Sequence, residues 1–242
     1  MARSAAVPQD EIDFRNKREQ DAGVWIKQDD GSWRCNTEVK IPVLLRASEI
    51  LVATAALLVS TPVILVLALL IRWDTRGPVF FRHTRIGING KPFMFIKLRS
   101  QYADNRQRFP EMCAYDFTPE SLPEVRLQEE DDPRVTRVGK WLRRSSLDEL
   151  PNFWHVLTGD MTLVGPRPEM WEMFRYYQGE MLQKFSVRPG ITGLAQICGR
   201  GYLTFEETIK FDLEYVKNKS WRRDMNILLR TIKQIFSGDG AM

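Results

Sequence analysis

Two adjacent carboxylates, Asp148 and Glu149, are the residues of this 242-residue sequence best suited to catalysis. They follow two arginines, Arg143 and Arg144, and a lysine, Lys140. Neighbouring residues on a helix diverge by about 100°, so this pair does not face itself across a substrate as a glycosidase pair must. The two can instead divide the work, one as nucleophile and one as metal ligand. Phosphoryl transfer needs both, because cations must neutralise the phosphates before a carboxylate attacks.

A structural role for the same residues is also consistent with the sequence. Ser146 and Glu149 have the spacing of a capping box, with Ser146 at the N-cap and Glu149 at N3. Acidic residues in a first helical turn stabilise the helix without any catalytic function. Pro151 favours a different start, as the N1 residue of a helix that runs towards Gly159. The residues alone leave both roles open.

Arg167 lies between Pro166 and Pro168, which restrict the backbone and the freedom of its side chain. The planar guanidinium suits phosphate oxygens, although a surface arginine in a rigid turn is the simpler interpretation. The later turns at 188–193 and 199–201 match neither the Walker phosphate loop nor the GxGxxG dinucleotide motif.

The composition narrows the partners and the compartment. A formal net charge of +4 suits nucleic acid, an anionic membrane or phosphate-bearing substrates. The sequence has no recognisable reading helix or aromatic platform, so we expect no nucleic-acid partner. Three widely spaced cysteines indicate a reducing compartment rather than a disulfide scaffold. The two histidines, His83 and His155, have no second ligand at metal-binding spacing, so a zinc site is not expected.

An apolar segment of membrane-spanning length precedes these residues. Residues 50–71 contain no charged side chain and match the roughly 20 apolar residues that cross a bilayer. This length favours a single transmembrane helix. A hairpin that enters and leaves one leaflet is favoured by Ser60-Thr61-Pro62 in its middle and by basic residues on both flanks, which prefer the cytoplasmic side. Charge counting leaves both topologies open.

Three further elements are predicted. Residues 79–97 form two short strands around Asn89-Gly90, which favours a hairpin turn. Residues 101–133 contain four prolines and are predicted to be a long loop or a pair of short helices. Apolar residues recur with helical spacing over 221–236, after Ser220 as a candidate N-cap, and basic residues occupy the opposite face. Such a helix either completes a soluble core or lies on anionic lipid.

Taken together, the motifs of the chain are similar to those of the bacterial sugar transferases, the monotopic phosphoglycosyl transferases that begin capsule, exopolysaccharide and glycoprotein glycan assembly. The resemblance runs from about Arg46 to the C-terminus. Any one block is weak, but the ordered set is specific. The matching blocks are 77–81, 85–87, 97–100, 132–136, 146–151, 159–168 and 188–196.

The resemblance implies a mainly α fold with a small β-hairpin. We expect a polar N-terminal extension over 1–40, a membrane-associated helix over 41–73 bent near Pro62, and a catalytic domain over 74–242. The anchor is expected to be re-entrant (helix–break–helix), and the compact cytosolic domain to carry interfacial amphipathic helices. This places the protein on the cytoplasmic face of the bacterial inner membrane. A cleaved signal peptide is not expected, because no apolar run directly follows a basic start.

The resemblance also implies a reaction, the transfer of a sugar 1-phosphate from a nucleotide sugar to polyprenyl (undecaprenyl) phosphate. A UDP-sugar donor is expected on this ground alone. Asp148 matches the nucleophile that forms a covalent aspartyl-phosphosugar intermediate, and Glu149 matches the residue associated with Mg²⁺. Nothing in the sequence decides between a monomer and a homo-oligomer. The basic residues implied in binding substrate phosphates are Lys97, Arg99, Arg143 and Arg167.

The sequence departs from the family pattern at three positions and at the start of the membrane helix. Gln is usual where His83 stands, Phe or Met where Leu98 stands, and Met where Gln101 stands. The basic-basic-x-x-Asp pattern is present only as residues 46–49, Arg-Ala-Ser-Glu. These departures concern packing and anchoring, whereas the carboxylate pair and the Pro-Arg-Pro turn are intact. The rival from another class is a non-catalytic, membrane-anchored assembly factor for polysaccharide export.

Overall fold

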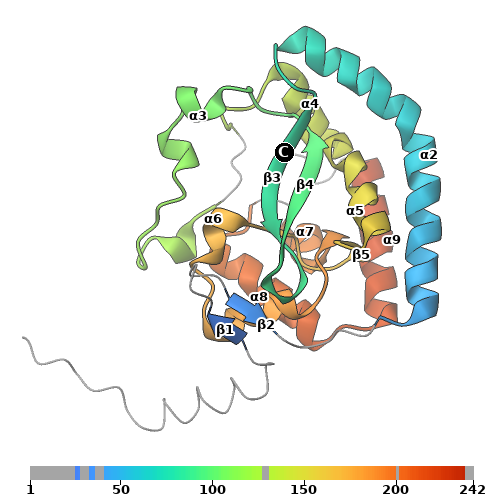
Figure 1. Cartoon of the computed structure of the whole chain (residues 1–242), viewed down its shortest axis with the longest axis vertical. Coiled ribbons are helices and arrows are strands. Elements are labelled where there is room, and N and C mark those ends of the chain that lie inside the picture. Colours follow the sequence, from blue (N-terminus) through green and yellow to red (C-terminus); the bar gives the residue numbers. More distant parts are fainter. Residues whose placement is uncertain (1–24, 28–32, 36–40, 127–130, 200–201, 238–242) are drawn as a thin grey trace, which may run out of the picture.

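The described part of the chain is mainly helical with a small antiparallel sheet, as the sequence predicted. The structure is a computed structural model and describes residues 25–27, 33–35, 41–126, 131–199 and 202–237. The predicted extension 1–40 lies outside these residues except for an antiparallel pair of short strands, β1 (Trp25–Lys27) and β2 (Trp33–Cys35). Figure 1 shows one long helix, α2, curving around a compact domain.

Helix α2 (Val43–Asp74) contains the predicted apolar segment and stays helical through Pro62. Proline has no N–H to donate to the preceding turn. The hydroxyls of Ser60 and Thr61 both donate to the carbonyl oxygen of Leu57, at 3.4 and 2.6 Å. The helix curves in Figure 1 without leaving the helical conformation, so no break interrupts it at Pro62.

One narrow face of α2 packs on the domain and the remaining faces are exposed. Leu67 and Ile71 are buried in a core cluster with Leu98 and Leu142. Among the described residues, α2 is the one helix long and apolar enough to cross a membrane. Large apolar side chains that are 63–86% exposed follow its outer side: Val43, Leu44, Leu51, Leu58, Val59, Leu65, Leu69 and Trp73.

Two charged residues near the start of α2 attach it to the domain. Arg46 donates to the carbonyl oxygens of Val156 and Leu157, at 2.6 and 2.7 Å, near the C-terminal end of another helix. Such carbonyls have no partner within their own helix, and a cation there is favourable. Glu49 is buried, and its two carboxylate oxygens accept from Nη2 of Arg188 at 2.9 and 2.7 Å. The unusual start of the membrane helix therefore forms its attachment to the domain.

The predicted hairpin is confirmed. Strands β3 (Phe80–Ile86) and β4 (Pro92–Leu98) are antiparallel, and Phe81 lies opposite Lys97. The turn between them contains a short 3₁₀ helix, η1 (Ile88–Gly90), in which Asn89 and Gly90 have φ of 56° and 71°. These positive values explain why this dipeptide favours a hairpin turn.

A third strand covers only part of the hairpin. Strand β6 (Glu169–Met170) pairs with the last two residues of β3, giving the sheet order β4-β3-β6. The first half of β3 therefore has no strand partner on that edge within the described residues. A second, parallel pair was not predicted and joins β5 (Thr162–Val164) to β7 (Gly190–Thr192).

The segment that carries the carboxylate pair begins with helix α4 (Arg137–Ser145). Thr136 caps it, because its hydroxyl accepts the N–H of Gly139 at 2.9 Å. A Cβ at Gly139 would lie 1.9 Å from the carbonyl oxygen of Ser100, so only glycine allows α4 to pack this closely against the end of β4. Helix α4 ends at Ser146 in the left-handed conformation, with φ of 56°.

The capping box predicted at Ser146 is wrong, because this residue closes α4 instead of opening the next helix through its side chain. A 3₁₀ helix, η4 (Leu147–Asn152), carries the carboxylates and contains Pro151. Helix α5 (Phe153–Thr158) follows and ends at Gly159, which has φ of 94°. The predicted helix towards Gly159 is thus present, but it starts after Pro151 rather than at it.

The remaining elements are short except for the last two helices. The segment 101–133 contains short helices, as one of its two interpretations predicted. Helix α8 opens with a capping box at Thr204 and Glu207. These elements are α3 (Asn105–Arg108), η2 (Glu111–Cys113), η3 (Leu122–Glu124), α6 (Trp171–Phe174), η5 (Gly179–Ser186), α7 (Leu194–Gly199) and α8 (Phe205–Lys217).

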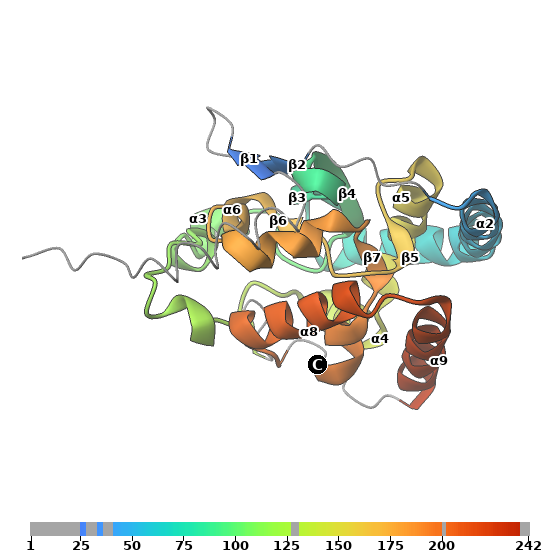
Figure 2. The same ribbon diagram turned by 90° about the horizontal axis from the view of Figure 1, so that it is seen from below.

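Helix α9 (Trp221–Ser237) confirms the predicted C-terminal helix. Ile227 is buried, but Leu229, Ile232 and Ile235 are 64%, 51% and 48% exposed. A role in the core therefore does not account for these three side chains. Helices α2 and α9 lie on the same side of the domain in Figures 1 and 2.

A buried histidine gives the domain a predicted dependence on pH. Nε2 of His155 accepts the N–H of Ile96 at 3.0 Å, and the ring stacks on Phe95. An imidazole that accepts through Nε2 carries its proton on Nδ1, which lies 3.7 Å from Asp160. Burial lowers the pKa of His155, and Asp160 opposes the shift only in part.

We expect stability to fall as the pH drops below about 6.5, the ordinary pKa of histidine in an unfolded chain. As the pH falls, the unfolded state binds this proton at a higher pH than the folded state does. The contribution of neutral His155 to stability is therefore complete above that pH and is lost as the pH falls towards the lower folded-state pKa. His155→Gln should show a smaller shift in urea midpoint between about pH 7.5 and 5.5. Burial also lowers the pKa of His83. This residue therefore affects the pH dependence of stability in the same direction in the wild type and in the variant. An equal shift in the variant would contradict the role of His155.

Candidate active site

The structure brings both carboxylates of η4 to basic residues that are distant in sequence. Asp148 is buried, and its Oδ2 lies 3.3 Å from Nζ of Lys97 on β4. Oε1 of Glu149 accepts from Arg167 at 2.6 Å, and Oε2 accepts from Nδ2 of Asn152 at 2.5 Å. Adjacent in sequence, the carboxylates thus have separate partners.

Arg143 approaches the same site from α4. Its Nε donates to the hydroxyl of Ser100 at 3.2 Å, and its Nη1 lies 3.4 Å from Oδ2 of Asp132. Asp132 is buried and also accepts from Arg134, at 2.8 Å from its Nε. These contacts hold the Arg143 side chain beside the carboxylate pair.

The turn that carries Arg167 is fixed by a buried charge network. Glu169 accepts from Nζ of Lys184 at 3.0 Å and from the hydroxyl of Tyr177 at 2.5 Å. Nζ of Lys184 also lies 3.1 Å from Asp212. Because Glu169 follows Arg167 by two residues, the network restrains the backbone that positions the Arg167 guanidinium.

The surroundings shift the two carboxyl groups in opposite directions. Burial raises the pKa of Asp148, and the positive charge of Lys97 opposes this shift only in part. Burial also disfavours the charged form of Glu149, but Arg167 and Lys97 outweigh it and hold the pKa of that carboxyl below its usual range. Environments that separate two pKa values in this way assign different roles to chemically similar groups.

One residue expected in the site is placed elsewhere. The guanidinium of Arg99 donates to the carbonyl oxygen of Pro78 at 2.5 Å, to Oγ1 of Thr75 at 2.7 Å and to the carbonyl oxygen of Gln101 at 3.2 Å. Arg99 therefore joins the end of α2 to the start of β3, away from the carboxylates. The structure does not bring it together with Lys97.

Two residues near the carboxylates were not expected there. Asn152 contacts Glu149 directly, and Arg85 donates to the carbonyl oxygen of Pro168 at 3.1 Å, next to Arg167. Arg85 belongs to the sequence block 85–87, so a signal existed for it. Asn152 follows Pro151 in the carboxylate block, but nothing in its spacing identified its partner.

A magnesium ion fits this donor set only if substrate supplies part of its coordination shell. No group of three or more His, Cys, Asp or Glu residues in the described ranges is placed to hold a metal ion. Mg²⁺ commonly takes one or two protein carboxylates and completes its shell with substrate phosphates and water. The buried Oδ1 of Asn152, which has no hydrogen-bond partner among the described residues, adds an acceptor beside Glu149. Glu149, with Asn152 beside it, would hold a magnesium ion that is bound together with substrate phosphate.

Fold and site together describe a domain with one long apolar helix and a buried carboxylate beside basic side chains, within the residues that the structure describes. The chain belongs to the bacterial sugar transferase family, whose model matches residues 41–238. The predicted family is thereby confirmed.

Curated relatives agree with this assignment. The UDP-glucose:undecaprenyl-phosphate glucose-1-phosphate transferase of Caulobacter vibrioides is 39% identical over 84% of this chain and 74% of its own length. The exopolysaccharide production protein ExoY of Rhizobium meliloti is 35% identical over 81% of this chain and 87% of its own. The galactosyl transferase CpsE of Streptococcus agalactiae is 40% identical over 68% of this chain. The chain spans only 36% of CpsE, so several relatives are much longer.

Proposed function

We propose that the protein transfers a sugar 1-phosphate from a UDP-sugar to undecaprenyl phosphate, as the first membrane step of exopolysaccharide, capsule or glycoconjugate synthesis. The observation that carries the proposal is the buried Asp148 carboxylate beside Lys97, Glu149 and Arg167. Two relatives have names that state this chemistry, the glucose-1-phosphate transferase of Caulobacter vibrioides and the undecaprenyl-phosphate galactose phosphotransferase of Salmonella typhimurium.

The reaction proceeds in two displacements at one phosphorus atom. A carboxylate oxygen of Asp148 attacks the β-phosphorus, the bond to the bridging oxygen breaks, and its electron pair leaves with the nucleoside monophosphate. The product is an acyl phosphate that carries the sugar. A phosphate oxygen of the lipid then attacks the same phosphorus, the Asp148 carboxylate leaves, and a sugar diphosphate lipid is formed. Covalent catalysis of this kind divides one difficult step into two easier ones.

The basic residues make the first attack feasible. Lys97, Arg143 and Arg167 offset the phosphate charge that otherwise repels Asp148, and the arginines offer bidentate donors. Glu149 stays ionised beside Arg167 and is the proposed ligand of Mg²⁺. A bound magnesium ion would neutralise the pyrophosphate and favour departure of the monophosphate.

The exposed apolar surfaces support a membrane location. Helix α2 exposes large apolar side chains along its length, and α9 exposes Leu229, Ile232 and Ile235. The two helices lie on the same side of the domain in Figures 1 and 2. We propose that α2 enters one leaflet from the cytoplasmic face as a re-entrant anchor and that α9 lies at the interface. The acceptor phosphate then reaches Asp148 without leaving the membrane surface.

The test is a panel of nucleotide sugars, incubated with the full chain, undecaprenyl phosphate and magnesium, in which release of nucleoside monophosphate is measured. Formation of a sugar diphosphate lipid with at least one UDP-sugar is the expected result. If no donor of the panel yields nucleoside monophosphate, the proposal is wrong and a non-catalytic assembly factor for polysaccharide export becomes the better description.

The shifted pKa of Asp148 predicts the acid side of the rate profile. The nucleophilic carboxylate is lost as pH falls through its raised pKa, so kcat/KM should decline at a higher pH than the ordinary aspartate value of about 3.9 allows. Lys97 opposes the shift, and Lys97→Met should therefore move this decline to still higher pH. The measurement is kcat/KM against pH for both proteins. A decline at the same pH in both would show that Lys97 does not interact with the titrating group.

A further inference from the structure

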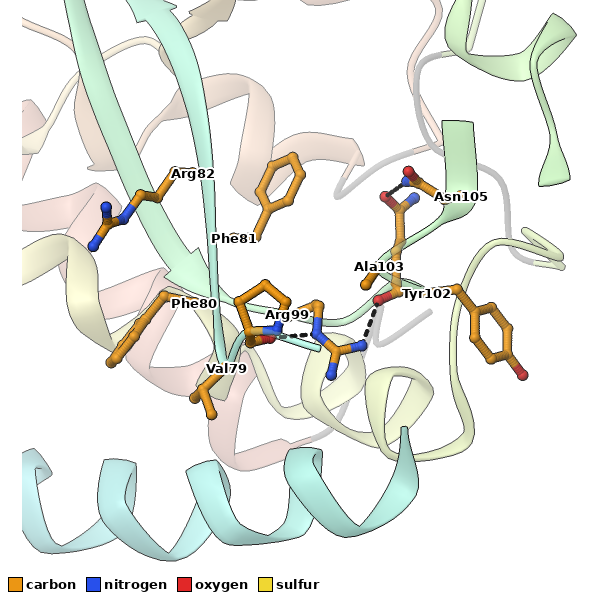
Figure 3. Close-up of a pocket in the computed structure, with 10 residues that line it drawn as sticks. Val79, Phe80, Phe81, Arg82, Arg99, Tyr102, Ala103 and Asn105 are labelled. Carbon is orange, nitrogen blue, oxygen red and sulfur yellow. Dashed lines mark hydrogen bonds between the residues drawn. The ribbon is translucent and has the colours of Figure 1, made fainter. Parts of the chain in front are cut away.

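A cavity of about 530 Å³ lies outside the carboxylate site, between the first half of β3 and the segment that follows β4. Figure 3 shows the ring of Phe81 on one side of this space and the side chain of Asn105 on the other, and Gln101 also lines it. Tyr102 and Phe80 also line it. In Figure 3 the ring of Tyr102 points away from Phe81, and Phe80 and Phe81 project from opposite faces of β3, as alternation along a strand requires.

The two walls of the cavity differ in chemistry. One wall carries the Phe81 ring, which also stacks on His83 with 5.8 Å between the ring centres. Opposite it, Nδ2 of Asn105 donates to Oε1 of Gln101 at 2.9 Å, and Nε2 of Gln101 donates to Asp132 at 3.1 Å. Because Asp132 accepts only, it fixes which way both amides point. The outer edge of β3 adds backbone groups that have no strand partner within the described residues. A flat group with hydrogen bonds along its rim is complementary to these walls.

The cavity adjoins the cations of the carboxylate site. Phe81 lies opposite Lys97 in the hairpin, and Nζ of Lys97 is 6.0 Å from the centre of the Phe81 ring and 3.3 Å from Asp148. On the other wall, Asp132 contacts both Gln101 and Arg143. Lining residues on both walls therefore contact residues that lie beside Asp148, Lys97 on one wall and, through Asp132, Arg143 on the other.

We propose that this cavity binds the nucleobase of the donor nucleotide, an inference that rests on the proposed function. Base stacking on Phe81 uses the aromatic wall, and the amide pair with the β3 edge meets the donors and acceptors of the base. The sugar ring fits less well, since each buried hydroxyl needs a partner and the Arg99 guanidinium at the floor already donates to protein oxygens. An isoprenoid chain would leave the amides unused.

The test measures binding of UMP and of inorganic pyrophosphate to the full chain in detergent or lipid nanodiscs. Phe81→Leu should weaken UMP binding at least about five-fold, because stacking on one base is lost, and should leave pyrophosphate binding unchanged. Asn105→Ala should do the same by removing the amide. Phe93→Leu is the matched control, since this ring belongs to the same hairpin but packs on Phe95 and His155 and does not line the cavity, and it should bind UMP like the wild type. Thermal unfolding of each variant checks that it is folded.

The opposite results are equally specific. Parallel losses of UMP and pyrophosphate affinity, equal losses in Phe93→Leu and Phe81→Leu, or no UMP binding by the wild type would overturn the assignment. If the Phe81→Leu and Asn105→Ala variants showed a higher KM for undecaprenyl phosphate and unchanged UMP binding, the cavity would be a lipid-binding site instead. If these variants showed changed selectivity among UDP-sugars and unchanged UMP binding, the cavity would bind the sugar ring instead. In each of these outcomes the wild type still releases nucleoside monophosphate from a nucleotide sugar. If the proposed function itself is wrong, the wild type releases none with any donor.

Discussion

Replacement of Asp148 by asparagine is expected to abolish release of nucleoside monophosphate, with a loss of at least about 10⁴-fold in kcat. Asparagine keeps the size of the side chain but has no anionic oxygen to attack phosphorus. The loss should appear even without acceptor lipid, because the first displacement itself is blocked. A single-turnover measurement with labelled nucleotide sugar would show covalent label on the wild type and none on Asp148→Asn.

The matched control is Asp160→Asn. This carboxylate belongs to the same domain, but its side chain is 41% exposed and its neighbour is His155 rather than a site residue. It should retain turnover within a small factor of the wild type. Full turnover or persistent covalent label in Asp148→Asn would instead remove Asp148 from the role of nucleophile, and Glu149 would be the next residue to test.

Glu49→Ala is expected to destabilise the domain by about 3–5 kcal/mol. The substitution leaves the guanidinium of Arg188 buried without its anionic partner, and Oγ1 of Thr162 also loses its acceptor, which lies at 2.5 Å. An unpaired buried charge costs more than the ion pair contributes, so removal of one partner has a large effect. Urea unfolding in detergent, followed by fluorescence, measures the loss.

A neighbouring residue and a second substitution make the result interpretable. Ser48→Ala changes an exposed position in the same helical turn and should be nearly neutral. Combining Glu49→Gln with Arg188→Gln should cost less than the sum of the single changes, because the two side chains interact directly. A loss under about 1 kcal/mol in Glu49→Ala would show that the pair does not hold α2 to the domain.

Local patterns were enough to predict several elements. Asn89-Gly90 indicated the hairpin because its turn needs positive φ, and the periodicity of 221–236 indicated α9. The same kind of reasoning failed at Ser146. Its spacing to Glu149 fits a capping box, but the close approach of Gly139 to Ser100 and the end of α4 determine how the chain continues. Tertiary packing thus decided between two local conformations that the sequence leaves open.

The candidate site depended still more on distant contacts. The pair of Asp148 with Lys97 joins residues 51 positions apart, and no local pattern specifies it. The similarity to a family supplied both residues, but it also supplied Arg99, whose guanidinium donates to backbone and hydroxyl oxygens at the end of α2. The presence of an arginine in a shared motif therefore does not identify the acceptor to which its guanidinium donates.

The attachment of α2 at both ends has a mechanical consequence. Arg46 and Glu49 fix its first turns to the domain, and Leu67 and Ile71 fix its last ones. The helix cannot roll about its axis or slide past the domain without breaking these contacts. In the proposed arrangement with α2 in lipid, these contacts would set the height of Asp148 above the head groups. A change in bilayer thickness would then tilt α2 and the domain together.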